Sequence, residues 1–450
     1  SSARENAFYL EQHLQLSVAM AYVWLGIAVL LQCLLTPVKL CEIPEGNTRL
    51  IRSLNLKLLR STIDNSGEPN PSIYIGLRLS EDHSLEREAD YLKKLKTSLE
   101  TITASSKTNN QDQPTTGILA LYLMALKSSC DDMEKPEMMR LITRLKHQLH
   151  KEKKQITEKD DPLTNYFQYS LGLIALCIHD KKVDEHVIQK LINVEKKDGF
   201  VHGDTVSVDT EAMAGLAFLC LKNSGLYSPT LTAEINLAIA NVKQKIIKSK
   251  NAEGALGNIY STPLAVQFLS ALGSTKDIEE CPKAISVLLE AMKQGKFSNP
   301  MMMSQLMPVL HQKSYLDVAN IKCTGNKDNL ILNPSTGMLP DVVVGEERIN
   351  IMITVESPLS EPVTFGVEAP ARSSLLDILK SAEKQNGNFM FKTKDSLYGP
   401  FLTMVNGVTA TLEERTYWQL LKDPNTPLEE GIADYRPEDG EVITLRLSKW

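Results

Sequence analysis

The chain has 450 residues, of which 42% are hydrophobic and 23% are charged, and its formal net charge is −6. This length is sufficient for two or three domains, each with its own core. The acidic balance, without any run of Lys and Arg interleaved with aromatic residues, excludes a general nucleic-acid-binding protein.

The beginning of the chain predicts a secretory leader. Val18–Leu31 is an uninterrupted apolar run, which is short for a membrane span and typical of the core of a signal peptide. A leader that starts at Met20 makes residues 1–19 upstream sequence, so we expect the secreted, extracellular protein to lack residues 1–40. A membrane anchor is the alternative interpretation of this run, but we expect no membrane insertion.

The cysteines agree with secretion. The leader contains Cys33, and its removal leaves six of the seven cysteines: Cys41, Cys130, Cys177, Cys220, Cys281 and Cys323. An even number of cysteines in a secreted chain predicts three disulfides, although the sequence alone leaves the pairing open. All six precede residue 324, which we take as the end of the first domain.

Residues 41–323 predict a domain built only from helices. Six apolar stretches recur roughly every 45 residues and open with amide or hydroxyl residues in most cases. They are Asn70–Leu77, Thr115–Leu123, Thr164–Leu173, Asp209–Phe218, Ser261–Phe268 and Met303–Leu310. Amphipathic stretches rich in Lys and Glu lie between them, at Leu85–Leu99, Met138–Thr157, Glu185–Glu195, Leu231–Lys248 and Cys281–Lys293. Alternating inner and outer helices of this kind predict an α6/α6 barrel.

The rest of the chain predicts a linker and a smaller α+β domain that is rich in strands. Residues 324–345 contain Gly, Asn and Pro with little periodicity, and the pattern changes to period two over residues 346–450. Arg348–Val355 and Pro362–Ala369 predict a hairpin, and Ser373–Lys384 predicts a helix capped by Ser373 or Ser374. Phe389–Thr393, Phe401–Val405 and Val442–Leu447 would complete one small mixed sheet, and this domain could cover the mouth of the barrel.

The starts of the inner helices favour binding over catalysis. Their polar side chains form a predicted ring of hydrogen-bonding groups: Thr164, Gln168, Asp209, Asn258, Ser261 and Gln305. A glycosidase needs two carboxylates about 5–10 Å apart, but only Asp209 stands at a helix start, with Glu211 in the following turn. Asp-rich, Cys-Gly-Glu-Gln and serine-hydrolase motifs are absent from the sequence. Taken singly, each of these side chains, Asp209 included, also fits a helix cap.

His202 stands in a polar loop shortly before Asp209. A histidine in such a loop is ordinarily an exposed side chain without a special role. A neutral imidazole is nevertheless a suitable axial donor for a transition metal that a ligand carries. We therefore keep His202 as a candidate metal ligand.

Longer motifs are similar to those of a known family. They are Cys41-Glu-Ile-Pro-Glu, Asn70-Pro-Ser-Ile-Tyr-Ile-Gly-Leu, Ser207-Val-Asp-Thr-Glu-Ala-Met-Ala-Gly-Leu-Ala-Phe, Gly257-Asn-Ile-Tyr-Ser-Thr-Pro-Leu-Ala, Thr416-Tyr-Trp-Gln-Leu-Leu-Lys-Asp-Pro-Asn-Thr-Pro-Leu and Gly431-Ile-Ala-Asp-Tyr-Arg-Pro. On these residues the chain resembles the cobalamin-carrier family. The resemblance implies a secreted, monomeric, non-enzymatic transport protein. Its barrel and strand-rich domain would enclose cobalamin, with its cobalt, and a cell-surface receptor would take the complex into cells.

The resemblance also implies particular residues. The disulfide pairs would be Cys41–Cys281, Cys130–Cys323 and Cys177–Cys220. The ligand contacts would be Thr164, Phe167, Gln168, Asp209, Asn258, Ser261 and Gln305 in the barrel, and Leu397, Tyr398, Gly399 and Trp418 in the second domain. His202 would be the ligand of the cobalt.

The chain departs from the pattern of the family at three of its positions. Ile118 stands where a Gln or Glu is usual, Phe167 replaces a Tyr, and Val206 stands where a His takes the upper cobalt position. His202 would then have to reach the metal from farther along the loop, or water keeps the position. A secreted α-toroid enzyme that acts on a polar glycan is the alternative function, and an interaction module without a small ligand is a third.

Overall fold

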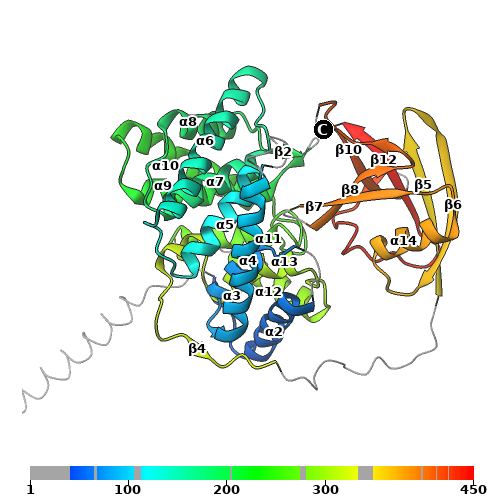
Figure 1. Ribbon diagram of the computed structural model, residues 1–450, viewed down its shortest axis with the longest axis horizontal. Helices are drawn as coiled ribbons and strands as arrows, with labels where there is room; N and C mark the ends of the chain where they lie inside the picture. Colours follow the sequence, from blue (N-terminus) through cyan, green and yellow to red (C-terminus); the bar gives the residue numbers. More distant parts are fainter. Residues whose placement is uncertain are drawn as a thin grey trace, which may run out of the picture.

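The computed structural model describes residues 41–64, 68–105, 113–202, 205–273, 280–332, 348–396, 399–411, 413–423 and 425–449. The predicted leader therefore lies outside the described residues. Figure 1 shows a helix-rich N-terminal part beside a strand-containing C-terminal part, which confirms the predicted division between helices and strands.

Six inner helices form the core of the N-terminal part. They are α3 (Pro71–Leu79), α5 (Thr116–Ser128), α7 (Tyr166–Ile178), α9 (Val208–Ser224), α11 (Thr262–Ala271) and α13 (Pro300–Leu310). Each inner helix packs against the next in chain order, and α13 packs against α3, so the contacts close into a ring. The helices are buried over most of their surface because their sequences are apolar on nearly every side.

Six outer helices surround this ring. They are α2 (Thr48–Asp64), α4 (Leu85–Ser105), α6 (Pro136–Lys159), α8 (Glu185–Lys196), α10 (Pro229–Lys248) and α12 (Glu280–Lys293). Helix α10 is typical, since it buries Leu231, Ile235, Val242 and Ile246 on one face and leaves charged residues on the other. Because each outer helix runs back between two inner ones, its last turns lie beside the starts of the inner helices.

Polar residues define where inner helices begin. The side chains of Asn70, Thr115, Asn165 and Asn299 each accept a hydrogen bond from a backbone N–H in the first turn of α3, α5, α7 and α13. These bonds satisfy donors that have no partner within a helix. The polar openings in the sequence therefore mark helix N-termini, and all of these N-termini lie at one end of the ring.

The other end of the ring is closed. The 3₁₀ helix η2 (Tyr315–Asn320) follows the end of α13 and contacts α3, α5, α7 and α9. Two glycines let neighbouring inner helices approach closely. A Cβ atom on Gly76 of α3 would lie 3.0 Å from the backbone Cα of Ser304 in α13, and one on Gly215 of α9 would lie 2.5 Å from the ring of Phe268 in α11.

Three disulfides tie the N-terminal part together, Cys41–Cys281, Cys130–Cys323 and Cys177–Cys220, and they match the pairs that the resemblance implies. After Cys323 the chain remains on the helical part. Lys327–Asp328 (β4) pairs in parallel with Asp82–His83 (β1), and Arg52 holds Asp82 through an ion pair of 3.3 Å. The first residues of the predicted linker are therefore attached to the helices, and residues 333–345 lie outside the described residues.

The C-terminal part contains two sheets. The larger has the order β11-β10-β12-β5-β6, from Thr426–Pro427, Thr416–Lys422, Val442–Lys449, Arg348–Ser357 and Ser360–Pro370. It is mixed, since β12 and β5 are parallel and the other pairs are antiparallel. Helix α14 (Leu375–Gln385) packs on β6 and is capped by Ser374.

The smaller sheet has the order β7-β8-β9, from Phe391–Ser396, Gly399–Val405 and Val408–Thr409. The prediction of one small sheet was therefore wrong. Strand β10 was not predicted, and it pairs with β12. The segments at Phe389 and Phe401 would have needed this position to join the larger sheet. Alternation of apolar residues identifies the buried face of a strand but not its partner, so the sequence could not separate the two sheets.

Candidate functional site

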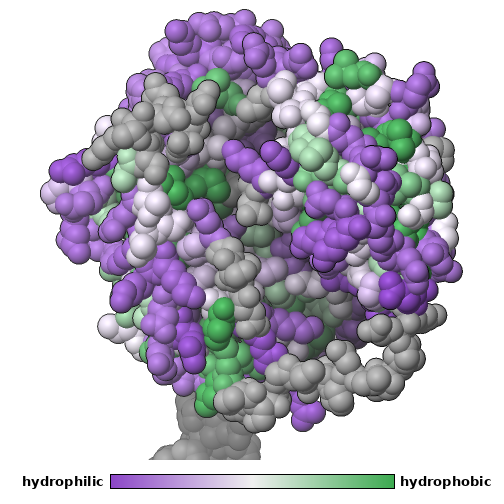
Figure 2. Space-filling view, turned by 45° about the vertical axis from the view of Figure 1, so that its right-hand side comes forward, coloured by the Kyte–Doolittle hydropathy of each residue, from purple (hydrophilic) through white to green (hydrophobic). Residues whose placement is uncertain are grey.

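The starts of the inner helices face the C-terminal part. Just before α11, the hydroxyl of Tyr260 donates a hydrogen bond of 2.5 Å to Glu430. The amide of Asn299, at the start of α13, donates one of 2.9 Å to Asp434. Before α7, Asp161 forms an ion pair of 3.1 Å with Arg415. Figure 2 shows a hollow between the two parts of the molecule, so the mouth of the helix ring opens into a space that the C-terminal part covers.

Thr164, in the turn before α7, is held by the helical part itself. Its hydroxyl donates 2.7 Å to Oε1 of Glu152, and its backbone N–H donates 3.1 Å to Oε2. The same carboxylate accepts from the hydroxyl of Thr116 at 2.7 Å and is buried near the end of α6. Glu152 thus joins the starts of α5 and α7, and the Thr164 hydroxyl contributes to this connection.

Asn258 and Ser261 form a closed turn before α11. The side-chain oxygen Oδ1 of Asn258 accepts from the backbone N–H groups of Tyr260 and Ser261. The hydroxyl of Ser261 donates 2.7 Å to the carbonyl of Leu256 and accepts from the N–H of Asn258. Gly257 has a φ of +74°, and a Cβ atom there would lie 2.5 Å from the Ser261 hydroxyl. The Ser261 hydroxyl is therefore bonded within the turn. The NH₂ group of Asn258 donates to no residue that the structure describes, so it can donate to a ligand.

Gln168 lies in the first turn of α7 and is partly engaged. Its side-chain oxygen accepts 3.2 Å from the backbone N–H of Gly117 at the start of α5, which leaves the NH₂ group as a donor toward the mouth. The preceding residue, Phe167, is buried. The structure thus brings one amide donor from α7 and one from the turn before α11 to the same end of the ring.

Asp209 and Gln305 are different because their side chains form no hydrogen bond with any residue that the structure describes. Asp209 lies inside the first turn of α9, and the N-cap position belongs to Ser207, whose hydroxyl bonds to that of Thr210. Burial raises the pKa of Asp209 to about 6, because loss of water disfavours the charged form. Gln305 lies in the second turn of α13 and is half-buried. Among the described residues, these two side chains therefore have no partner that a ligand would have to displace.

Glu211 is held by α10 and has no contact with Asp209 among the described residues. It is buried and forms an ion pair of 3.3 Å with Lys245 of α10. Lys245 also binds Glu195 and Asp198 at 2.9 Å each. Burial raises the pKa of Glu211 to about 7, against the opposing effect of Lys245. This cluster fixes the start of α9 against α8 and α10.

The predicted residues of the C-terminal part lie in different places. Gly399 begins β8 with a φ of +98°, and a Cβ atom there would lie 3.3 Å from the amide nitrogen of Asn299, so β8 reaches the start of α13. Trp418 is 5% exposed in the core of the C-terminal part, and its indole N–H has no partner among the described residues. Leu397 and Tyr398 lie outside the described residues.

His202 lies in a short hairpin of β2 (Val201–His202) and β3 (Thr205–Val206), where its backbone pairs with that of Thr205. The structure does not describe its side chain. Val201 and Val206, which pair across the hairpin, are about half exposed. The hairpin precedes α9 directly and therefore belongs to the same rim as Asp209.

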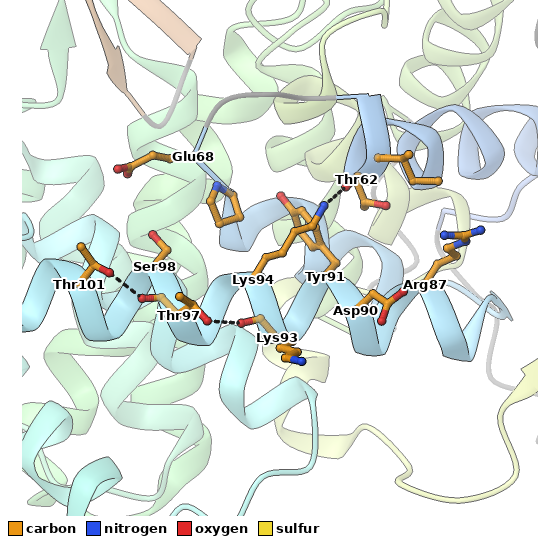
Figure 3. Close-up of a pocket in the computed structure, with 12 residues that line it drawn as sticks. Thr62, Glu68, Arg87, Asp90, Tyr91, Lys93, Lys94, Thr97, Ser98 and Thr101 are labelled. Atoms are coloured by element: carbon orange, nitrogen blue, oxygen red, sulfur yellow. Dashed lines mark hydrogen bonds between the residues drawn. The ribbon is translucent and has the colours of Figure 1, made fainter.

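A second hollow, of about 660 Å³, lies on the outer helix α4 beside the segment that leads into α3 (Figure 3). Residues from the end of α2 and from α4 line it, among them Thr62, Arg87, Tyr91 and Lys94. Lys94 donates a hydrogen bond of 3.3 Å to the carbonyl of Thr62 across it. The candidate residues predicted from the sequence do not line this hollow.

Four residues that join the two parts of the molecule were not predicted. Tyr260, Asn299, Glu430 and Asp434 hold the C-terminal part over the mouth. Asn299 before Pro300 is a recognisable helix start, but a sequence does not indicate which acid in a distant segment will meet it. Within the described ranges, no cluster of three or more His, Cys, Asp or Glu side chains could hold a metal ion, and no helix is long and apolar enough to cross a membrane.

Comparisons with known proteins show the family and the fold of the chain. A family model described as eukaryotic cobalamin-binding protein matches residues 23–341, and one described as a domain of unknown function (DUF4430) matches residues 373–449. Transcobalamin-2 of Bos taurus is 44% identical over 91% of this chain and 96% of its own length, and that of Homo sapiens is 40% identical over 92% and 96%. Cobalamin binding intrinsic factor of Homo sapiens is 29% identical over 91% and 94%. The crystal structure of haptocorrin in complex with Cbi has a TM-score of 0.74 at 24% identity, over 91% of this chain and 99% of that one, and it supports the fold.

Proposed function

Because the chain belongs to the family of eukaryotic cobalamin-binding proteins, we propose that it is a transport protein that encloses cobalamin between its helical and its strand-rich parts. The cobalamin is carried unchanged together with its cobalt. The mouth of the helix ring supplies hydrogen bonds to the amide groups at the edge of the corrin, and the C-terminal part excludes water from above.

The observation that carries this function is a pair of polar side chains at the mouth, Asp209 and Gln305, that bond to no residue that the structure describes. A polar group that loses water without gaining a partner costs about 1–3 kcal/mol, so these groups favour a ligand that supplies hydrogen-bonding groups. Asn258 and Gln168 add amide donors at the same rim. A ligand whose edge is lined with amides can satisfy all four residues.

The proposal also extends to the architecture. We infer that residues 41–323 form an α6/α6 barrel, supported by the closed ring of contacts among α3, α5, α7, α9, α11 and α13. Residues 346–450 would form the second domain, and residues 324–345 would join the two. Lys327–Asp328, the first described strand of this segment, pairs with β1 and so stays with the helical part.

The remaining contacts of the resemblance stay part of the proposal. Gly399 would bring the backbone of β8 to the ligand, and Leu397 and Tyr398, which precede it in the chain, would contact the ligand as well. Trp418 belongs to β10 and is buried, so it would hold this strand in place. Thr164, Phe167 and Ser261 would shape the mouth rather than donate freely, since the hydroxyls of Thr164 and Ser261 are already bonded and Phe167 is buried.

His202 would bind the cobalt from the β2–β3 hairpin. Replacing it in His202→Ala should shift the visible spectrum of bound aquocobalamin toward the form in which water binds the metal. An unchanged spectrum would remove His202 from the cobalt site.

We infer no catalytic activity. A glycosidase mechanism needs a second carboxylate near Asp209. Glu211 is ion-paired with Lys245, and Glu152 accepts hydrogen bonds from Thr116 and Thr164. Both carboxylates are thus committed to the structure, which weighs against the alternative of an enzyme that acts on a polar glycan.

Secretion, uptake and oligomeric state belong to the same proposal. Three disulfides are typical of a protein that matures in an oxidising compartment. We propose a secreted monomer whose loaded form is bound by a cell-surface transcobalamin receptor.

Gel filtration of the purified secreted protein with an excess of aquocobalamin tests the function. We expect a red protein peak that carries one cobalamin per chain and keeps it through a second column. Elution of all cobalamin with the small molecules, or release of sugar from a polar glycan, would contradict the proposal.

A further inference from the structure

We propose that the C-terminal part stays attached to the starts of α11 and α13 and swings open at the start of α7, so that cobalamin enters between Asp161 and Arg415. This inference rests on the proposed function and specifies how the ligand reaches the site. It follows from a difference between the contacts on the two sides of the mouth.

The contact at the start of α13 is buried. Asn299 is 9% exposed and Asp434 is 7% exposed, and their hydrogen bond is 2.9 Å long. The side-chain oxygen of Asn299 also accepts from the N–H of Met301, so the cap of α13 orients its NH₂ group toward Asp434. Separation of the two residues would leave a buried carboxylate and a buried amide without each other, which is costly unless water enters.

Tyr260 provides a second contact on this side. Its hydroxyl bonds to Glu430, and its ring packs against that of Phe297 with the ring centres 6.0 Å apart. The ring contact fixes the direction of the hydroxyl before docking. Both partner carboxylates thus meet groups that the helical part already holds in place.

Glu430 and Asp434 lie on one segment, residues 428–436, which is rigidly joined to the rest of the C-terminal part. Ile432 is buried in its core. The carbonyl of Ile432 accepts 2.7 Å from the N–H of Leu376, and that of Tyr435 accepts 2.8 Å from the N–H of Leu375. Because the segment is fixed on the start of α14, the C-terminal part would pivot at these contacts as one body.

The contact that the described residues form at the start of α7, the ion pair of Asp161 with Arg415, is weak by comparison. The side chain of Arg415 is 47% exposed and that of Asp161 is 56% exposed, and both ions keep much of their water. Exposed ion pairs of this kind contribute little to stability and are screened by salt. This contact can therefore break and form again at small cost.

The order of the helices places these contacts on opposite sides. In the ring α3-α5-α7-α9-α11-α13, α7 is the helix opposite α13. A pivot at α13 thus gives its largest opening at α7. Gln168 of α7 and Asp209 of the neighbouring α9 lie on the side that would open, next to the entering ligand.

Chemical crosslinks on the two sides test this inference. All six cysteines after the leader are in disulfides, so cysteines introduced in pairs would be the reactive thiols of the secreted protein. A short bismaleimide joins Asp161→Cys to Arg415→Cys in one variant, and Tyr260→Cys to Glu430→Cys in the other. Mass spectrometry measures the fraction crosslinked, and stopped-flow absorbance measures the association rate of aquocobalamin.

We expect the crosslink at Asp161 and Arg415 to lower the association rate at least tenfold, and the crosslink at Tyr260 and Glu430 to leave it within twofold of the uncrosslinked variant. The same pairs changed to serine, Asp161→Ser with Arg415→Ser and Tyr260→Ser with Glu430→Ser, control for loss of folding. Slow association only in the variant crosslinked at Tyr260 would overturn the inference, as would equal rates in both. Failure of the wild-type protein to bind cobalamin would instead contradict the proposed function.

Discussion

Asp209 and Gln305 differ from the other polar residues at the mouth in what their side chains already bind. Partners within the helical part bind the hydroxyls of Thr164 and Ser261 and the side-chain oxygens of Asn258 and Gln168. The side chains of Asp209 and Gln305 have no partner among the described residues. The sequence places all six at helix starts, but it does not show which of them the fold itself uses. That depends on the path of the backbone, as in the turn that closes Ser261 onto Leu256.

Gln305→Ala should weaken cobalamin binding. The change removes a hydrogen-bonding side chain that has no role within the described fold, so we expect a loss of about 1–2 kcal/mol of binding free energy. Calorimetric titration measures it. Gln294→Ala is the matched control, since Gln294 is exposed at the end of α12 and bonds only to Glu290. Equal affinities for the two variants would exclude Gln305 from the site.

Asp209 should make binding dependent on pH. Its pKa in the unliganded protein is about 6, and a ligand amide that donates to the carboxylate would lower it. The ionised form would then bind more tightly, so the affinity should be full above pH 6 and should fall as the pH drops through this value. Affinities measured from pH 4.5 to 8 should show this fall in the wild type and lose it in Asp209→Asn. The same pH profile in both would assign the titration to another group.

Thr164 should matter more for stability than its place at the mouth suggests. Thr164→Val removes a hydrogen bond to the buried carboxylate of Glu152, which we expect to lower the free energy of unfolding by about 1.5–3 kcal/mol. Thr164→Ser retains the hydroxyl and should lose less. Urea unfolding compares the two, and equal stabilities would mean that the bond to Glu152 contributes nothing.

At the scale of the elements, the helices were the part of the fold that could be predicted best. The polar openings at Asn70, Thr115 and Asn165 are helix caps, and the apolar runs that follow are the inner helices. The strands were less predictable, because the alternation of buried and half-buried positions in β10 breaks at Leu420, which follows the half-buried Gln419. A strand whose partner is set by long-range pairing leaves a weaker pattern in the sequence.

The closure of the helix ring should depend on Gly76. A Cβ atom at this position would lie 3.0 Å from the backbone of α13, and a backbone cannot move aside as a side chain can. We expect Gly76→Ala to lower the free energy of unfolding by about 1–3 kcal/mol, despite the better helix propensity of alanine. Gly387→Ala is the control, since nothing lies near its Cβ position, and it should be close to neutral. A Gly76→Ala variant as stable as the control would show that α3 and α13 can separate without cost.

At the scale of the whole molecule, the family and the cobalamin-carrying function predicted from the sequence motifs are confirmed by the similarity to the eukaryotic cobalamin-binding proteins. The docking of the two parts could not be predicted. Tyr260 and Glu430 are 170 residues apart, and Asn299 and Asp434 are 135 apart, so no local pattern connects them. Such pairs become visible only when both folds and their arrangement are known.

Cobalamin should join the two parts into one unfolding unit. Without the ligand, the small contacts between them let each part unfold at its own temperature, so scanning calorimetry should show two transitions. A ligand bound by both parts stabilises both by mass action, by about 2.7 kcal/mol at a hundredfold excess over Kd. We therefore expect both transitions to rise and merge when cobalamin is present. A shift of the helical transition alone would place the ligand on that part only.

The central claim is that the mouth of the helix ring and the strand-rich part hold cobalamin between them. A crystal structure of the complex tests it most directly. We predict that the corrin lies between the starts of the inner helices and β8, with amide groups within hydrogen-bond distance of Asp209 and Gln305. Cobalamin in the hollow on α4, or on one part of the molecule without contact to the other, would contradict the account.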